Sequence, residues 1–244
     1  MSDAARDAYV ELIKRAVSNY LYLGDAGSFA AFNATEHYDQ KASQWRVDPL
    51  SRPASLLSKG QLDLIERSLL DIVARGVPGH LLEAGVWRGG AVVLMRALLE
   101  AYGIPERKVF AADSFAGIPL NTQFKHDPVD LWEDRWAASL DEVRTMIERF
   151  GLLDERVVLV EGLFADTLPG LEQTFALIRL DSDSYDSVLT SLDLLYPRLS
   201  PGGIVIVDDW HLPGCRFAVD AYRKREHIAG PVQQDAGNGW WVKD

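Results

Sequence analysis

Five short apolar runs alternate with helix-length segments from residue 80 onward, and this alternation constrains the fold more than any other feature of the sequence. The runs have the length of β-strands, are bounded by Gly, Pro or Asp, and cover residues 80–86, 108–115, 156–162, 175–181 and 203–209. The segments between them have the length of helices and cover residues 91–102, 139–150, 184–196 and 214–226. This pattern predicts an α/β fold with a doubly wound, mostly parallel sheet that is covered by helices on both faces.

The segment before these runs, residues 1–78, predicts N-terminal helices and a lid, whereas residues 79–244 predict the core, in a single compact domain overall. Apolar residues at helical spacing predict one helix from Tyr9 onward. A second helix begins at the N-cap Ser58 and is expected to bury an apolar stripe made of Leu62, Ile65, Leu69, Ile72 and Val73. Residues 24–58 are irregular, with Pro49 and Pro53 as breakers, and predict a loop or lid.

The C-terminal tail has the pattern of a β-hairpin. Asn238 and Gly239 lie between two short strand-like runs, and this dipeptide is typical of a two-residue hairpin turn. We therefore expect a terminal hairpin that turns at these two residues.

Charge and cysteine content exclude several classes of partner. The chain has 244 residues, with 25 Lys and Arg against 36 Asp and Glu, and its formal net charge of −11 is expected to repel nucleic acid and anionic lipid. The single cysteine, Cys215, cannot form an intrachain disulfide and is expected to pack as a small apolar residue. The sequence shows neither a signal-peptide pattern nor an apolar window long enough for a bilayer. We expect a cytoplasmic protein without a nucleic-acid or membrane partner.

The end of the first apolar run is a candidate binding turn, because doubly wound sheets bind ligands at the carboxyl ends of their strands. Glu83, Gly85, Val86 and Trp87 form this turn, where glycine lets the backbone approach a ligand at a helix N-terminus. Trp87 stands where a dinucleotide fold has a glycine, which disfavours a close pyrophosphate. Glu83 suits a ligand with a cationic amino group, as in S-adenosylmethionine. The alternative is an ordinary tight turn.

The second and third runs end in residues that suit a nucleoside. Asp113, followed by Ser114, can accept hydrogen bonds from both hydroxyls of a ribose; the alternative is a helix N-cap. Gly162 and Phe164 belong to an apolar loop that can cover an adenine ring, although such residues are more often part of a core.

Four carboxylates follow the fourth and fifth runs. Asp181 and Asp183 close one strand, and Asp208 and Asp209 close the next. Because like charges at one sheet edge repel each other, the cluster requires a cation, and Mg²⁺ is an ion that carboxylate oxygens bind. The alternative makes Asp183 and Asp208 helix N-caps and leaves the others solvated. A cap accounts for one acid at each strand end, whereas two are present at both.

These residues belong to motifs that occur in the order found in a known family. The motifs are E-A-G-V-W-R-G-G (83–90), A-D-S-F-A-G-I-P (112–119), G-L-F-A-D-T-L-P (162–169), R-L-D-S-D-S-Y (179–185) and Y-P-R-L-S-P-G-G-I-V-I-V-D-D (196–209). Y-V-E-L-I-K-R-A-V-S-N-Y (9–20) and C-R-F-A-V-D-A-Y-R (215–223) extend the match. The chain thereby resembles, over nearly its whole length, the macrocin O-methyltransferase (TylF-like) family, which comprises sugar O-methyltransferases of macrolide and aminocoumarin antibiotic pathways.

The resemblance implies a class I methyltransferase with a Rossmann-like core, S-adenosylmethionine as methyl donor and Mg²⁺ as the required ion. It implies Asp181, Asp208 and Asp209 as metal ligands, and Asp183 as the general base with Asp181 as its catalytic neighbour. The implied cofactor contacts are Glu83, Gly85, Val86, Trp87, Asp113, Ser114, Gly162, Phe164 and Asp181. Residues 24–53 and 120–138 show no motif of the family and correspond to its substrate lid.

The expected acceptor is a small-molecule glycoside, and the resemblance suggests a homo-oligomer in which the N-terminal helix contacts a partner subunit. Side chains near the carboxylates or in the lid are candidates for the acceptor pocket, with His211 also an alternative base: Tyr185, Trp210, His211, His126, Trp132 and Trp136. Within methyltransferases, the alternative is a catechol-type enzyme that uses the same metal. Outside them, the alternatives are a noncatalytic binding module and an NAD(P)-dependent oxidoreductase, which Trp87 and the lack of a Tyr-x-x-x-Lys pair disfavour.

Overall fold

The predicted doubly wound sheet is confirmed. The computed structural model describes residues 2–24, 36–39, 44–47, 53–119, 123–125, 127 and 136–244. Five parallel strands coincide with the five apolar runs: β3 (His80–Ala84), β4 (Val109–Asp113), β5 (Val157–Glu161), β6 (Phe175–Leu180) and β7 (Leu199–Val207). With the antiparallel strands β8 (Gln233–Asp235) and β9 (Asn238–Val242), they form a seven-stranded sheet of order β5-β4-β3-β6-β7-β9-β8.

The strand order creates a topological switch point between β3 and β6. From β3 the chain moves outward to β4 and β5, and it then returns to place β6 on the other side of β3. Ligands in open α/β sheets bind outside the carboxyl ends of the strands at such a point. The fold therefore places the candidate turns of the sequence around one location.

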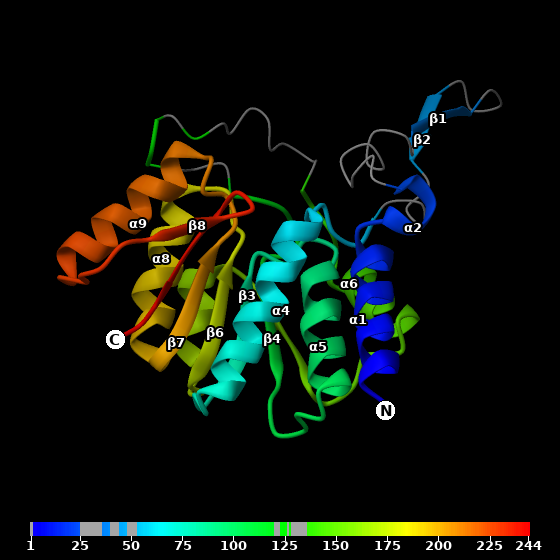
Figure 1. The fold of residues 1–244 in the computed structure, drawn as a ribbon. Coiled ribbons are helices and arrows are strands. Elements are labelled where there is room, and N and C mark those ends of the chain that lie inside the picture. Colours follow the sequence, from blue (N-terminus) through cyan, green and yellow to red (C-terminus); the bar gives the residue numbers. More distant parts are fainter. Residues whose placement is uncertain are drawn as a thin grey trace.

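Helices cover both faces of the sheet (Figure 1). One face packs against α4 (Lys59–Ala74), α5 (Gly90–Ala101) and α6 (Leu140–Arg149), with α1 (Asp3–Val17) packed on α5, and the other face packs against α8 (Tyr185–Leu195) and α9 (Pro213–Arg225). Alternate strand residues serve the two cores: Leu81 and Leu177 face the first, whereas Leu82 and Ile178 face the second. Because both faces are covered, the strands are mostly apolar and do not alternate regularly with polar residues. Shorter elements complete the chain: α2 (Tyr20–Leu23), α7 (Phe164–Thr167) and the 3₁₀ turns η3 (Leu168–Gly170) and η4 (Tyr196–Arg198).

The predicted start of α4 is confirmed. Ser58 is its N-cap, and a capping box joins Ser58 and Gln61 in both directions. Four residues of the predicted stripe are buried, whereas Val73 is 37% exposed, so its predicted burial is wrong. On α1, Ile13 and Val17 are buried, but Leu12 faces solvent.

The segment 24–58, which we expected to be irregular, contains a short antiparallel hairpin. Its strands are β1 (Glu36–Asp39) and β2 (Gln44–Val47), with Glu36 opposite Val47. The expected lid function falls largely on residues outside the described part of the chain, as do His126 and Trp132.

The terminal hairpin is confirmed, but its turn is two residues earlier than predicted. Asp235 pairs with Asn238, so Ala236 and Gly237 form the turn, both with positive φ of 50° and 86°. Gly239 lies in β9, where a Cβ atom would stand 2.4 Å from the ring of Trp210. The glycine is therefore required by the close approach of Trp210 and not by the turn.

Candidate functional site

A cavity of about 810 Å³ opens at the carboxyl ends of the parallel strands. The loops after β3, β4, β5, β6 and β7 all contribute to its wall. All of the residues predicted to bind the cofactor or the metal ion, or to act in catalysis, line this cavity: Glu83, Gly85, Val86, Trp87, Asp113, Ser114, Gly162, Phe164, Asp181, Asp183, Asp208 and Asp209. The structure therefore gathers them in one place, while their individual roles stay predictions.

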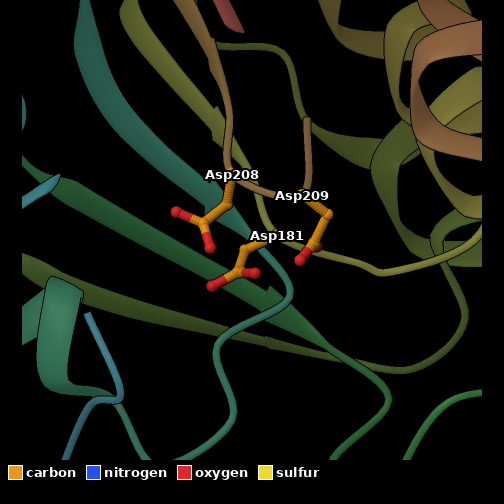
Figure 2. A group of neighbouring side chains, drawn as sticks. All are labelled: Asp181, Asp208 and Asp209. Atoms are coloured by element: carbon orange, nitrogen blue, oxygen red, sulfur yellow. The ribbon is translucent and has the colours of Figure 1, made fainter. Parts of the chain in front are cut away.

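Three of the carboxylates lie side by side at the ends of β6 and β7 (Figure 2). One oxygen from each of Asp181, Asp208 and Asp209 lies within 4.8 Å of the other two. The pairing of Leu180 with Val207 causes this convergence, because Asp181 and Asp208 are the next residues on neighbouring parallel strands. The backbone N–H of Asp208 also donates to the carbonyl of Leu180 at 2.9 Å, which extends the ladder into the site.

A buried arginine lies beneath the carboxylates, and the sequence analysis missed it. Arg179, in β6, is 1% exposed, and its strand neighbour in register is Glu83 of β3. Its guanidinium donates to Glu83, to Asp181 Oδ2 at 2.7 Å and to Asp208 Oδ1 at 2.5 Å. An arginine inside an otherwise apolar strand is the signal that would have revealed this ion pair.

Arg179 alters the charge argument made from the sequence. Glu83 and the four aspartates at the ends of β6 and β7 supply five carboxylates to this cluster, against the guanidinium of Arg179. Part of the repulsion is thus offset by the protein itself, so a metal ion is not the sole source of compensation. A surplus of negative charge still faces the cavity.

Burial sets the protonation behaviour of this cluster. Desolvation raises the pKa of Glu83 to about 8, although Arg179 opposes the shift. Desolvation also raises the pKa of Asp183 to about 8 and that of Asp208 to about 7, and it places the pKa of Asp209 well above the usual range of an aspartate. A cation bound among these oxygens would stabilise their charged forms.

Asp183 has a backbone conformation that is uncommon for a residue with a side chain. Its φ is 59°, in the left-handed region, and its N–H donates to Asp209 Oδ2 at 3.3 Å. The N-cap of α8 is Ser184, whose hydroxyl accepts from the N–H of Ser187, and α9 begins after Leu212. The alternative that Asp183 and Asp208 are helix caps is therefore wrong.

The turn after β3 is held from inside by Asp113. One carboxylate oxygen of Asp113 accepts from the N–H groups of Val86 at 2.6 Å and Trp87 at 3.2 Å, and the other accepts from Phe115 at 2.8 Å. The N-cap alternative for Asp113 is replaced by this bridge between two loops. Contact with a ribose stays a prediction.

Gly85 is required by its own protein neighbours. It has a φ of 88°, and a Cβ atom would stand 1.7 Å from the carbonyl oxygen of Asp181. The loops after β3 and β6 thus cross in direct backbone contact. Glycine at this position brings the two loops together, where we had expected it to admit a ligand.

Gln61 is a second residue that the sequence analysis missed. It lies in the first turn of α4, lines the cavity and donates from Nε2 to Asp208 Oδ1 at 3.0 Å. Its partner in the capping box, Ser58, precedes it by one helical turn. The start of α4 therefore reaches the carboxylate cluster directly.

The other candidate side chains have different positions. His211 is exposed and lines the cavity, whereas Tyr185 stacks on Phe124 with ring centroids 5.4 Å apart, and neither Tyr185 nor Trp210 is among the described residues of the wall. Trp136 lines the cavity and meets Trp87 edge-on at 6.0 Å. Cys215 is fully buried, as expected.

The fold is that of a Rossmann-like methyltransferase. Structural similarity is strong to a solved structure described as the O-methyltransferase NovP, with 31% identity, a TM-score of 0.81 and coverage of 98% of this chain and 99% of that one. A calicheamicin methyltransferase, CalS11, shares the fold at a TM-score of 0.56 and 20% identity, with 99% and 94% of the two chains covered.

Residues 10–243 match the family model of the macrocin-O-methyltransferases (TylF), and the chain belongs to this family. It is 39% identical, over 98% of this chain and 93% of that one, to a protein of Streptomyces olivaceus described as 8-demethyl-8-(2,3-dimethoxy-alpha-L-rhamnosyl)-tetracenomycin-C 4'-O-methyltransferase. It is 35% identical to the mycinamicin III 3''-O-methyltransferase of Micromonospora griseorubida, over 96% of each chain. The chain is an O-methyltransferase, and the oxidoreductase and noncatalytic alternatives are wrong.

Within the described part of the chain, no helix combines the length and the apolar character needed to cross a membrane.

Proposed function

We propose that this enzyme transfers the methyl group of S-adenosylmethionine to a sugar hydroxyl of a glycosylated natural product, with Mg²⁺ bound by Asp181, Asp208 and Asp209. The observation that carries the proposal is the convergence of these three carboxylates on a cavity of about 810 Å³ in a member of an O-methyltransferase family. The names of its relatives support a glycoside acceptor, since they include a rhamnosylated tetracenomycin and a demethyldecarbamoylnovobiocin.

The donor set fits Mg²⁺. All three candidate ligands offer carboxylate oxygens, which this hard ion prefers, and the distance limit of 4.8 Å among them allows one ion to contact all three. Arg179 occupies Oδ2 of Asp181 and Oδ1 of Asp208, which leaves the second oxygen of each carboxylate for the ion. The surplus of carboxylates over Arg179 supplies the negative charge that a divalent cation requires.

The cavity also fits S-adenosylmethionine. Glu83 Oε2 is buried and has no hydrogen-bond partner among the described residues, so an acceptor is present for the amino group of the methionine half. Leu163, which is 51% exposed, and Phe164 line the same cavity and offer an apolar cover for an adenine ring. These positions agree with the roles that we expected from the sequence for the turn after β3 and the loop after β5.

Asp183 is the proposed general base. When bound, S-adenosylmethionine supplies an electrophilic methyl group and Mg²⁺ a Lewis acid that lowers the pKa of an acceptor hydroxyl. Asp183 would accept the proton of the acceptor hydroxyl on its carboxylate, and the turns after β3 and β4 would hold the cofactor whose methyl group that oxygen takes. A base whose pKa lies near the working pH suits such a proton transfer.

The remaining residues hold the reacting groups in place. Asp113 fixes the turn of Val86 and Trp87, and Gly85 brings that turn against Asp181. Orientation of this kind accounts for a large share of the rate of an enzyme that joins two substrates. His211 lies on the wall as an alternative proton acceptor, and His211→Ala separates it from Asp183.

The test is a panel of acceptors analysed by mass spectrometry. Glycosides that carry free sugar hydroxyls should gain one methyl group, and simple catechols should not; methylation of catechols alone would support the catechol-type alternative. Turnover should stop when the divalent ion is chelated. Asp181→Ala and Asp208→Ala should lose nearly all turnover while they still bind S-adenosylhomocysteine in calorimetric titration, and unchanged turnover would refute the assigned site.

The homo-oligomer also belongs to this proposal. Leu12 and Leu21 of the N-terminal helices are exposed apolar residues, 52% and 41%. Sedimentation velocity should show a species larger than the monomer, and Leu12→Glu should shift it toward the monomer.

A further inference from the structure

Two donors converge on a single oxygen of Asp208. Arg179 Nη2 lies 2.5 Å from Asp208 Oδ1, and Gln61 Nε2 lies 3.0 Å from the same atom. The two donors come from different parts of the fold, the interior of β6 and the first turn of α4. Together they fix the rotation of the Asp208 carboxylate.

The orientation of the Gln61 amide is defined by its two neighbours. Its Oε1 accepts from the N–H of Ser58 at 2.8 Å, while its Nε2 faces the carboxylate of Asp208. The N–H of Ser58 can only donate, and a carboxylate ordinarily accepts, so the opposite orientation of the amide would lose both contacts. Gln61 therefore connects the cap of α4 to the carboxylate cluster.

We propose that Gln61 is a positioning residue for Asp208, and that with Arg179 it occupies Oδ1 and turns Oδ2 toward the divalent ion. This inference rests on the proposed metal site. A ligand whose second oxygen is held by the protein has lost its rotational freedom before the ion arrives, so less of the binding free energy is spent on ordering it.

The same contact ties one wall of the cavity to the metal site. Residues 54–57 line the cavity, and Ser58, the N-cap that follows them, is hydrogen-bonded to Gln61. A displacement of this wall would therefore move the donor that holds Asp208. Gln61 acts through Asp208 and is not itself assigned a contact with substrate or ion.

The test compares two variants that both break the capping box. Gln61→Met removes the donor to Asp208 together with the cap, whereas Ser58→Ala removes only the hydroxyl that accepts from the N–H of Gln61 at 3.3 Å. Mg²⁺ binding to the full chain is measured by calorimetric titration without substrate, after circular dichroism has established that each variant is folded. Gln61→Ala, which adds no bulk, replaces Gln61→Met if that variant does not fold.

We expect Gln61→Met to weaken Mg²⁺ binding about tenfold, the effect typical of a lost partner of a metal ligand, and Ser58→Ala to bind within about twofold of the wild type. In turnover assays, the Mg²⁺ concentration for half-maximal activity should rise for Gln61→Met, while kcat at saturating Mg²⁺ is largely retained. Equal Mg²⁺ affinity in Gln61→Met and the wild type would overturn the inference, as would equal weakening in both variants, which would indicate a capping role alone. A wild type that binds no Mg²⁺ would instead refute the metal site of the proposed function, and this inference with it.

Discussion

Replacement of Arg179 by methionine should destabilise the protein strongly, because it leaves buried carboxylates without their cation. The side chain of Arg179 is 1% exposed, and its partners Glu83 and Asp208 are 2% and 12% exposed, so solvent screens these two pairs little. Asp181 is 30% exposed and contributes less. Removing one partner from a buried ion pair costs about 3–5 kcal/mol, which is a large part of the roughly 5–15 kcal/mol that stabilises a typical domain.

The measurement is urea denaturation of Arg179→Met and the wild type at pH 8, followed by circular dichroism. The control is Arg75→Met, which removes an exposed pair with Asp71 on one face of α4 and should cost less than about 1 kcal/mol. If Arg179→Met costs no more than Arg75→Met, the buried cluster does not depend on Arg179 and the reasoning fails.

The loss of stability in Arg179→Met should also depend on pH. Burial raises the pKa of Glu83 to about 8 and that of Asp208 to about 7. A carboxyl group whose pKa is raised on folding contributes most stability below its unfolded pKa and loses it as the pH rises through the folded value. At pH 5.5 the carboxyl groups are largely protonated and no longer need a cation, so Arg179→Met should be closer to the wild type there than at pH 8. Addition of Glu83→Gln should restore part of the stability at pH 8.

Three further outcomes are expected. Mg²⁺ should raise the melting temperature more at pH 8 than at pH 6, because burial raises the pKa of the proposed ligand Asp208 to about 7 and that of Asp209 well above its usual range, so protons compete with the ion. Equal shifts in scanning fluorimetry would argue against these ligands. Gly85→Ala should prevent folding or lower the free energy of unfolding in urea by more than about 3 kcal/mol. The control is Gly76→Ala, at a φ of 64° with nothing within 4 Å of a Cβ atom, which should lower it by about 1–2 kcal/mol. Similar losses of stability in the two variants would contradict the backbone contact at Gly85. Cys215 should resist DTNB in the native protein and react on unfolding, because its thiol is fully buried and burial raises its pKa. Rapid labelling of the native protein would show that α9 is not packed as described.

The sheet and the location of the site were predictable from the sequence because both depend on local patterns. Apolar runs of strand length predict parallel strands, and parallel strands bring their carboxyl ends to one edge. The pairing of Leu180 with Val207 then makes Asp181 and Asp208 neighbours, as the sequence analysis expected.

Contacts between distant segments account for what was missed. Arg179 lies inside an apolar run, which marks it as unusual, but its three partners lie at the ends of three different strands. The register of β3 with β6 is needed to identify Glu83 as one of them. The hairpin turn was misplaced because Gly239 suggested a turn by its residue type, whereas the structure requires glycine there for the close approach of Trp210. In the sequence, Gln61 has only the pattern of a capping residue. Its contact with Asp208 joins residues 147 positions apart, which no local pattern reveals.

The carboxylate of Asp113 gives the turn after β3 a polarity opposite to that of a phosphate-binding loop. In dinucleotide enzymes the N–H groups at such a turn point toward the ligand and attract its phosphates. Here the N–H groups of Val86 and Trp87 are already bound by Asp113, which presents a negative charge where an anion would have to approach. These two N–H groups are therefore not available to a phosphate, and the exchange of Trp87 for glycine alone would not free them.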